Sequence, residues 1–172
     1  MLKWTAQIGL MVITIALIVV VGISAGHQNQ RVSAQGINWI TFEQLQDSMK
    51  IKPKRVFVKI YTDWCGPCKA MDKKVLTKSR ITEPLSRYYY SIAFNAEQTQ
   101  SIKFKDSTFA FNPKLGPGTH NLAYHLGKDA EHMYYPTIVI LDEKLEILYH
   151  YPGYMNVTNL EEALYLYKDL QK

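Results

Sequence analysis

Cys65 and Cys68 are the residues best suited to chemistry, and they are the only two cysteines in a chain of 172 residues. They belong to the run WCGPCK, residues 64–69, where a predicted strand gives way to a predicted helix. Two intervening residues let both sulfur atoms approach disulfide distance across one turn. Cys65 is expected at the helix N-terminus, where free amides and the helix dipole stabilise a thiolate. Cys68 is expected one turn further in, shielded and able to resolve a mixed disulfide, so the pattern predicts a redox couple.

Pro67 supports this position for the motif, because its missing N–H costs nothing in the first turn of a helix. The competing interpretation is that the cysteines form half of a metal site. His120, His125 and His132 lie in a later segment, but His120 and His125 are five residues apart and do not share a helix face. We therefore favour the redox couple, with no metal and no cofactor.

The elements that must position the motif alternate between helix and strand. Thr41 and Gln44 fit a capping box for a helix that runs to about Met49. Thr119 is the expected cap of a helix that Gly127 ends. The apolar runs predict strands at 56–61, 91–95 and 137–141 and a returning hairpin strand at 145–149, with further helices at 69–76, 79–89 and 159–170. The order α-β-α-β-α-β-β-α predicts an α/β fold.

The N-terminal residues 1–26 form a predicted signal peptide or membrane anchor. No charged side chain occurs between Trp4 and Gln30, and Lys3 and Arg31 flank this stretch. A cleaved leader has an apolar stretch of roughly 7–15 residues before a small-residue site such as 32–34. An uncleaved anchor needs about 20 apolar residues, and both interpretations remain open. Both predict export, with a linker at 27–37 and one folded domain at 38–172.

Composition excludes several other classes of protein. The chain is 47% hydrophobic, which suffices for an ordinary core, and two cysteines cannot make a multi-bridge scaffold. The 20 basic residues exceed the 15 acidic ones by five. These basic residues are scattered among acidic ones, so we expect no nucleic-acid partner.

The residues around the motif resemble those of the thioredoxin-like family, which includes thioredoxins and periplasmic thiol:disulfide interchange proteins. WCGPCK matches thioredoxin residue for residue. Pro136, in the sequence Tyr135-Pro136-Thr137, matches the cis-proline that faces the cysteines in this family, and Gly153 matches a glycine beside that site. The resemblance covers roughly residues 38–172. It implies a thioredoxin fold, with a central mixed sheet flanked by helices and an insertion before the cis-proline strand.

The resemblance also implies roles for individual residues. Cys65 is the expected nucleophile and Cys68 the resolving cysteine. Trp64 is expected to shield the disulfide and touch the partner protein. The remaining residues expected to shape the site are Gly66, Pro67, Tyr135 and Pro136.

Two departures from the family pattern stand out. Lys59 occupies the position where thioredoxins usually carry a buried aspartate. A charged lysine cannot accept a proton, so our hypothesis is that Lys59 favours a thiolate and lowers the pKa of the thiols. The alternative is that it reaches the surface and has no redox role. The second departure is the insertion at 96–118, which is either a groove for a partner or a passive loop.

The predicted function is that of an exported thiol–disulfide oxidoreductase, most simply a protein-disulfide reductase of the bacterial periplasm or cell envelope. Its expected partners are disulfide-containing proteins and a membrane electron donor, and the N-terminal segment attaches it to the membrane if uncleaved. The alternatives are a disulfide oxidase or isomerase, and a thioredoxin-like binding module with little turnover.

Overall fold

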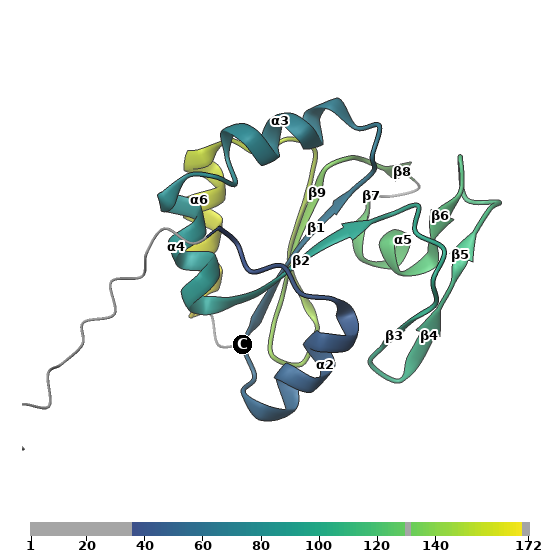
Figure 1. The fold of residues 1–172 in the computed structure, drawn as a ribbon, viewed down its shortest axis with the longest axis horizontal. Helices are drawn as coiled ribbons and strands as arrows, with labels where there is room; N and C mark the ends of the chain where they lie inside the picture. Colours follow the sequence, from purple (N-terminus) through teal and green to yellow (C-terminus); the bar gives the residue numbers. More distant parts are fainter. Residues whose placement is uncertain (1–35, 130–131, 170–172) are drawn as a thin grey trace, which may run out of the picture. The chain divides into compact units, whose positions relative to one another are not determined.

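The computed structural model describes residues 36–129 and 132–169 of the chain (Figure 1). The predicted leader at 1–26 and nearly all of the linker at 27–37 lie outside these residues, so the prediction for them remains a prediction. Within the described ranges, no helix combines the length and apolar character needed to cross a membrane.

A four-stranded mixed sheet with the order β10-β9-β1-β2 forms the centre of the domain. Its strands are β1 (Arg55–Tyr61), β2 (Tyr89–Asn95), β9 (Thr137–Leu141) and β10 (Ile147–Pro152). β2 runs parallel to β1, whereas β9 runs antiparallel to it. β1 and β9 are buried on both faces, as their nearly continuous apolar sequences predict.

In the described part of the chain, the helices that cover the two faces of this sheet are α2 (Phe42–Ile51), α3 (Gly66–Lys74), α4 (Ser79–Tyr88), α5 (Asn121–Gly127) and α6 (Val157–Tyr167). The residues of α3, α4 and α6 form one core with Phe57 of β1. The residues of α2 and α5 form the other core with Val56, Val58 and Ile60. The capping box of Thr41 and Gln44 is present at the start of α2, which confirms that prediction.

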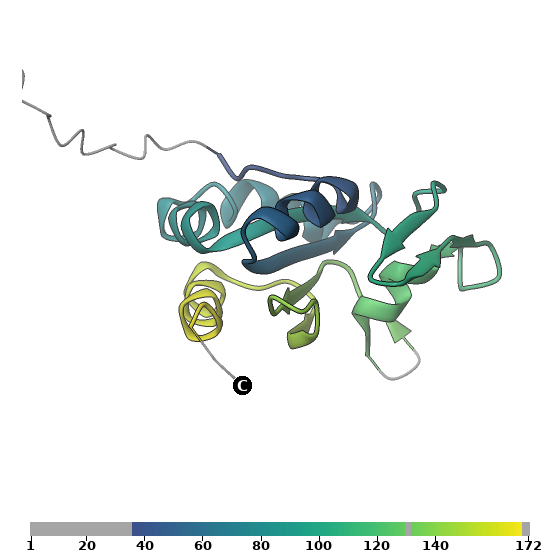
Figure 2. The ribbon, with the colours of Figure 1, turned by 90° about the horizontal axis from the view of Figure 1, so that it is seen from below.

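The insertion folds into short antiparallel pairs rather than an irregular loop. β3 (Ile102–Phe104) pairs with β4 (Ser107–Phe109), and β5 (Phe111–Asn112) pairs with β6 (Thr119–His120). After α5, β7 (Lys128–Asp129) pairs with β8 (His132–Met133), a pair that the sequence analysis did not predict. The strands β3–β6 and α5 gather at the end of the sheet away from α4 and α6 (Figures 1 and 2).

The predicted cap of α5 is wrong by one residue. Thr119 lies in β6, and the ring of His120 accepts a hydrogen bond from the N–H of Leu122. His120 is fully buried, and its other ring nitrogen contacts the carbonyl oxygen of Gln100 at 3.0 Å. A neutral imidazole can accept a hydrogen bond at one ring nitrogen and donate one at the other, so both of these backbone groups have a partner. His120 therefore anchors the insertion to the core.

Sheet topology brings the motif and Pro136 to the same edge. Because β1 and β9 are antiparallel, the end of β1 lies beside the start of β9, and Ile60 pairs with Thr137. Cys65 follows β1 and Pro136 precedes β9, so the two meet at this edge. Tyr61 pairs with Asn95 of the parallel strand β2, which brings Glu97 to the same edge.

Candidate functional site

Cys65 and Cys68 form a disulfide at the N-terminus of α3, with an S–S distance of 2.05 Å. Cys65 is the N-cap residue, and its sulfur accepts a hydrogen bond from the N–H of Cys68 at 3.0 Å. Pro67 lies in the first turn, where a backbone N–H has no acceptor within the helix, so the absence of this donor in proline costs nothing. Only Cys68 was expected to be shielded, but Cys65 is 2% exposed and Cys68 is 1% exposed. In this oxidised state both sulfur-bearing residues are covered.

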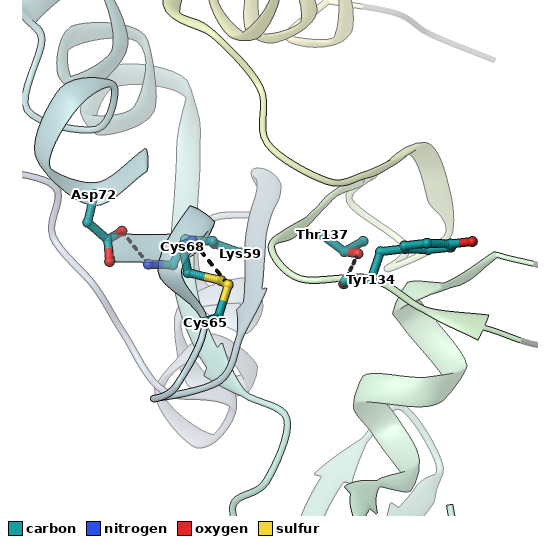
Figure 3. The surroundings of a disulfide bond; sticks show 6 residues. All are labelled: Lys59, Cys65, Cys68, Asp72, Tyr134 and Thr137. Carbon is teal, nitrogen blue, oxygen red and sulfur yellow. Dashed lines mark hydrogen bonds and ion pairs between the residues drawn. A yellow bond between two sulfur atoms is a disulfide. The ribbon is translucent and has the colours of Figure 1, made fainter. Parts of the chain in front are cut away.

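The segment from Tyr134 to Thr137 lies across the site from the disulfide (Figure 3). The peptide bond between Tyr135 and Pro136 is cis, as the resemblance predicted. The carbonyl of Pro136 accepts a hydrogen bond from the N–H of Gly153 at 2.7 Å, and Gly153 has a φ of +98°. The Thr137 hydroxyl donates to the carbonyl of Tyr134 at 2.6 Å. These two bonds fix the backbone on both sides of Pro136.

Trp64 is 62% exposed, an unusual position for so large an apolar side chain. Its ring meets the ring of Tyr135 edge-on, with centroids 5.8 Å apart. Its indole N–H donates to the Glu97 carboxylate at 2.8 Å. The exposed ring is thus held in one orientation from both sides, and Tyr135 links it to the cis-proline segment.

Lys59 does not reach the surface, so the part of the alternative that placed its side chain there is wrong. The residue is only 4% exposed, and its ammonium group forms an ion pair with the carboxylate of Asp72 on α3 (Figure 3). The side chain of Asp72 is 46% exposed and lies one helical turn after Cys68. The Lys59 ammonium also lies 4.7 Å from the centre of the Tyr61 ring. A buried cation and its carboxylate therefore lie beside the disulfide.

A cavity of about 780 Å³ opens beside this ion pair. Lys59, Asp72 and Tyr61 line it, together with Trp39 and Thr82. Burial, followed by the charges of Asp63 and Asp72, raises the pKa of Tyr61 above its usual range, which keeps its phenol neutral. The cavity gives the carboxylate of Asp72 a route to solvent that Cys68 itself lacks.

The structure brings together all the residues that the sequence predicted for the site: Lys59, Trp64, Cys65, Gly66, Pro67, Cys68, Tyr135 and Pro136. It adds Asp72 and Glu97, which the sequence analysis did not select. Asp72 follows Cys68 by four residues on a predicted helix, a spacing that places two side chains on one face. Glu97 follows a strand parallel to β1, and parallel strands end at the same edge.

Comparisons with known proteins agree with this architecture. A family model described as a thioredoxin-like domain matches residues 42–168. A solved thioredoxin from Thermus thermophilus is similar, with a TM-score of 0.56 and 14% identity over 77% of this chain and 87% of the other. A DsbH oxidoreductase gives a TM-score of 0.53 and 16% identity over 81% of this chain and 92% of that protein.

A thioredoxin-fold protein from Helicobacter pylori is also similar, with a TM-score of 0.50 and 17% identity. That match covers 70% of this chain and 75% of the other. At these identities the likeness concerns the fold. A search of the curated proteins finds no match to the sequence.

Proposed function

The chain belongs to the thioredoxin-like family, and from this membership we propose that it is an exported protein-disulfide reductase that works through Cys65 and Cys68. The fold is of the thiol–disulfide oxidoreductase type and carries a CxxC pair at 65–68. The observation that carries the proposal is the disulfide at the N-terminus of α3, across from a cis-proline. Gly-Pro between the cysteines resembles the reducing members of the family and supports the direction.

The reaction begins with the reduced protein. The Cys65 thiolate attacks one sulfur of a partner disulfide, and the other partner sulfur leaves as a thiolate with the electron pair. The thiolate of Cys68 then attacks the sulfur of Cys65 in the mixed disulfide. This step releases the second partner thiolate and forms the Cys65–Cys68 disulfide. Two electrons have passed to the partner, and protons from solvent complete its two thiols.

Individual residues support these steps in the proposal. The N–H of Cys68 already donates to the Cys65 sulfur, and the same donor stabilises a thiolate there. Trp64 covers the disulfide and contacts the partner, while Tyr135 and Pro136 hold the partner's chain beside Cys65. Lys59 acts through its positive charge, because a buried cation favours a thiolate over a thiol nearby. The predicted leader at 1–26 supports placement in the cell envelope, where a membrane donor would return the electrons.

Trapping of the mixed disulfide tests this function. In the Cys68→Ser variant the second attack is removed, so the full chain should remain covalently bound to partner proteins in cells. These adducts should disappear on treatment with a reductant. The matched Cys65→Ser variant lacks the nucleophile and should trap nothing. Equal adduct formation by both variants would contradict the assigned roles, and the absence of adducts from Cys68→Ser would contradict the enzyme itself.

A further inference from the structure

A cleft of about 380 Å³ adjoins the redox site and is built largely by the insertion and by the β7–β8 pair. Trp64 and Tyr135 form the wall nearest the disulfide. The apolar side chains that line the rest are Leu115, Pro117, Tyr124 and Met133. Its size is near the lower end of the range of about 300–1,000 Å³ for ligand pockets, so it fits one or two side chains.

The wall of the cleft opposite Trp64 and Tyr135 is the loop between β5 and β6, and hydrogen bonds order this loop and attach β6 to the core. The loop between β5 and β6 is held by the Asn112 side chain, which accepts a hydrogen bond from the N–H of Lys114 at 3.0 Å. Gly118 has a φ of +102°, and a Cβ there would lie 2.6 Å from the Phe111 ring, so this bend requires glycine. β6 then joins the core because the N–H of His120 donates to the carbonyl of Ala96 at 2.7 Å.

A single lysine supplies the formal charge among the described residues that line the cleft, whereas the nearby Glu97 carboxylate is occupied by the indole N–H of Trp64. This lysine is Lys114, and none of the described residues that line the cleft is acidic. Lys114 is exposed, so its ammonium group is available to a carboxylate in solution. The cleft therefore combines an apolar lining with one exposed cation, Lys114, and such a charge favours a partner group of opposite sign.

We propose that this cleft binds a segment of the disulfide-bonded partner protein, one that carries an aromatic or large apolar side chain and a carboxylate close to the reactive cysteine. The inference rests on the proposed function. A partner sulfur bonded to Cys65 places its own chain beside Trp64 and Tyr135, where the cleft begins. Extended chain advances about 3.3 Å per residue, so residues two to four positions away reach the cleft. The insertion thus selects partners by the sequence around their cysteine.

Activated peptides test this selectivity with the reduced full chain. Each peptide contains one cysteine bound as a mixed disulfide to thionitrobenzoate, and attack by Cys65 on the peptide sulfur releases the coloured thiolate. Three peptides are compared: one with phenylalanine and aspartate near the cysteine, one with phenylalanine and lysine, and one with serine and aspartate. The first should react about three- to fivefold faster than either of the others, as expected for one favourable contact of about 1 kcal/mol.

Cleft variants connect that preference to named residues. Lys114→Glu should reverse the preference for aspartate over lysine, and Leu115→Ser should reduce the preference for phenylalanine over serine. Both residues lie in the loop between β5 and β6, outside the two cores. Lys50→Glu on α2 is the matched control. It makes the same charge change at an exposed residue that does not line the cleft, and it should leave both preferences as in the wild type.

The outcomes separate the inference from the function on which it rests. If the wild type reacts with all three peptides at one rate, or if the cleft variants keep its preferences, the cleft inference is wrong and the reductase remains. If the wild type releases no thionitrobenzoate from any peptide, the proposed function fails and the inference fails with it.

Discussion

The ammonium group of Lys59, on the central strand β1, forms an ion pair with the carboxylate of Asp72, one turn beyond Cys68 on α3. The two partners differ in their surroundings: the side chain of Lys59 is 5% exposed, whereas that of Asp72 is 46% exposed. Water can stabilise Asp72 without Lys59, but Lys59 has little access to water without Asp72. This asymmetry leads to two separate predictions.

The first prediction concerns the acidity of the redox thiols. Lys59→Met removes the buried charge and keeps most of the side-chain volume, so the pKa of the more acidic thiol should rise and its alkylation at neutral pH should slow. The rate of alkylation of the reduced protein, measured against pH, reports this pKa. Lys50→Met removes an exposed charge from α2 and serves as the control. An alkylation profile of Lys59→Met identical to that of the wild type would mean that Lys59 does not act on the thiols.

The second prediction concerns stability. Asp72→Asn leaves the buried ammonium group without a carboxylate, and the free energy of unfolding should fall by about 3 kcal/mol. Lys59→Met leaves only a half-exposed carboxylate, and replacing a buried ion with an apolar side chain is often close to neutral. Denaturant unfolding of the oxidised proteins measures both. Equal losses for the two variants would contradict the asymmetry.

The third prediction concerns His120. Burial lowers its pKa below the ordinary value of about 6.5, although the hydrogen bond to the Gln100 carbonyl acts in the opposite direction. Below pH 6.5 the unfolded chain therefore binds a proton more readily than the folded one, and stability is lost as the pH falls. Above pH 6.5 this contribution is fully present. Protonation would also convert the ring nitrogen that accepts the N–H of Leu122 into a donor, so this hydrogen bond would be lost.

A matched variant isolates this group. His120→Asn retains a good N-cap residue for α5 and does not titrate. Between about pH 7.5 and pH 5.5, the wild type should lose more unfolding free energy than His120→Asn, while the other histidines contribute equally to both. Parallel curves of unfolding free energy against pH would exclude His120 as the source of the dependence.

Sequence reasoning succeeded where a pattern is local. The strand at 137–141 has the predicted bounds, because a continuous run of apolar residues next to a turn leaves few alternatives. The capping box at Thr41 and the disulfide motif depend on spacings of only three residues, so they too could be read directly. Pro136 could be placed because the family resemblance predicts a cis-proline that faces the cysteines.

The insertion could not be predicted in the same way. Its pairs have two or three residues per strand, which is too short for a period of two to show. Thr119 looks like the better helix cap, since threonine is favoured at that position. His120 caps instead because the contact with Gln100 fixes its ring. The ion pair between Lys59 and Asp72 could not be predicted from local sequence either, because it depends on how α3 packs against β1.

The reduction potential of the Cys65–Cys68 couple tests the central claim most directly. The full chain is equilibrated with dithiothreitol or glutathione redox buffers, and the fraction of oxidised protein is measured by thiol labelling. A reductase requires a potential near that of thioredoxin, about −270 mV, whereas a strong oxidase lies near −120 mV. We predict a value near −270 mV. A value near −120 mV would contradict the proposed direction of the reaction, and failure to form the Cys65–Cys68 disulfide reversibly would contradict the redox couple itself.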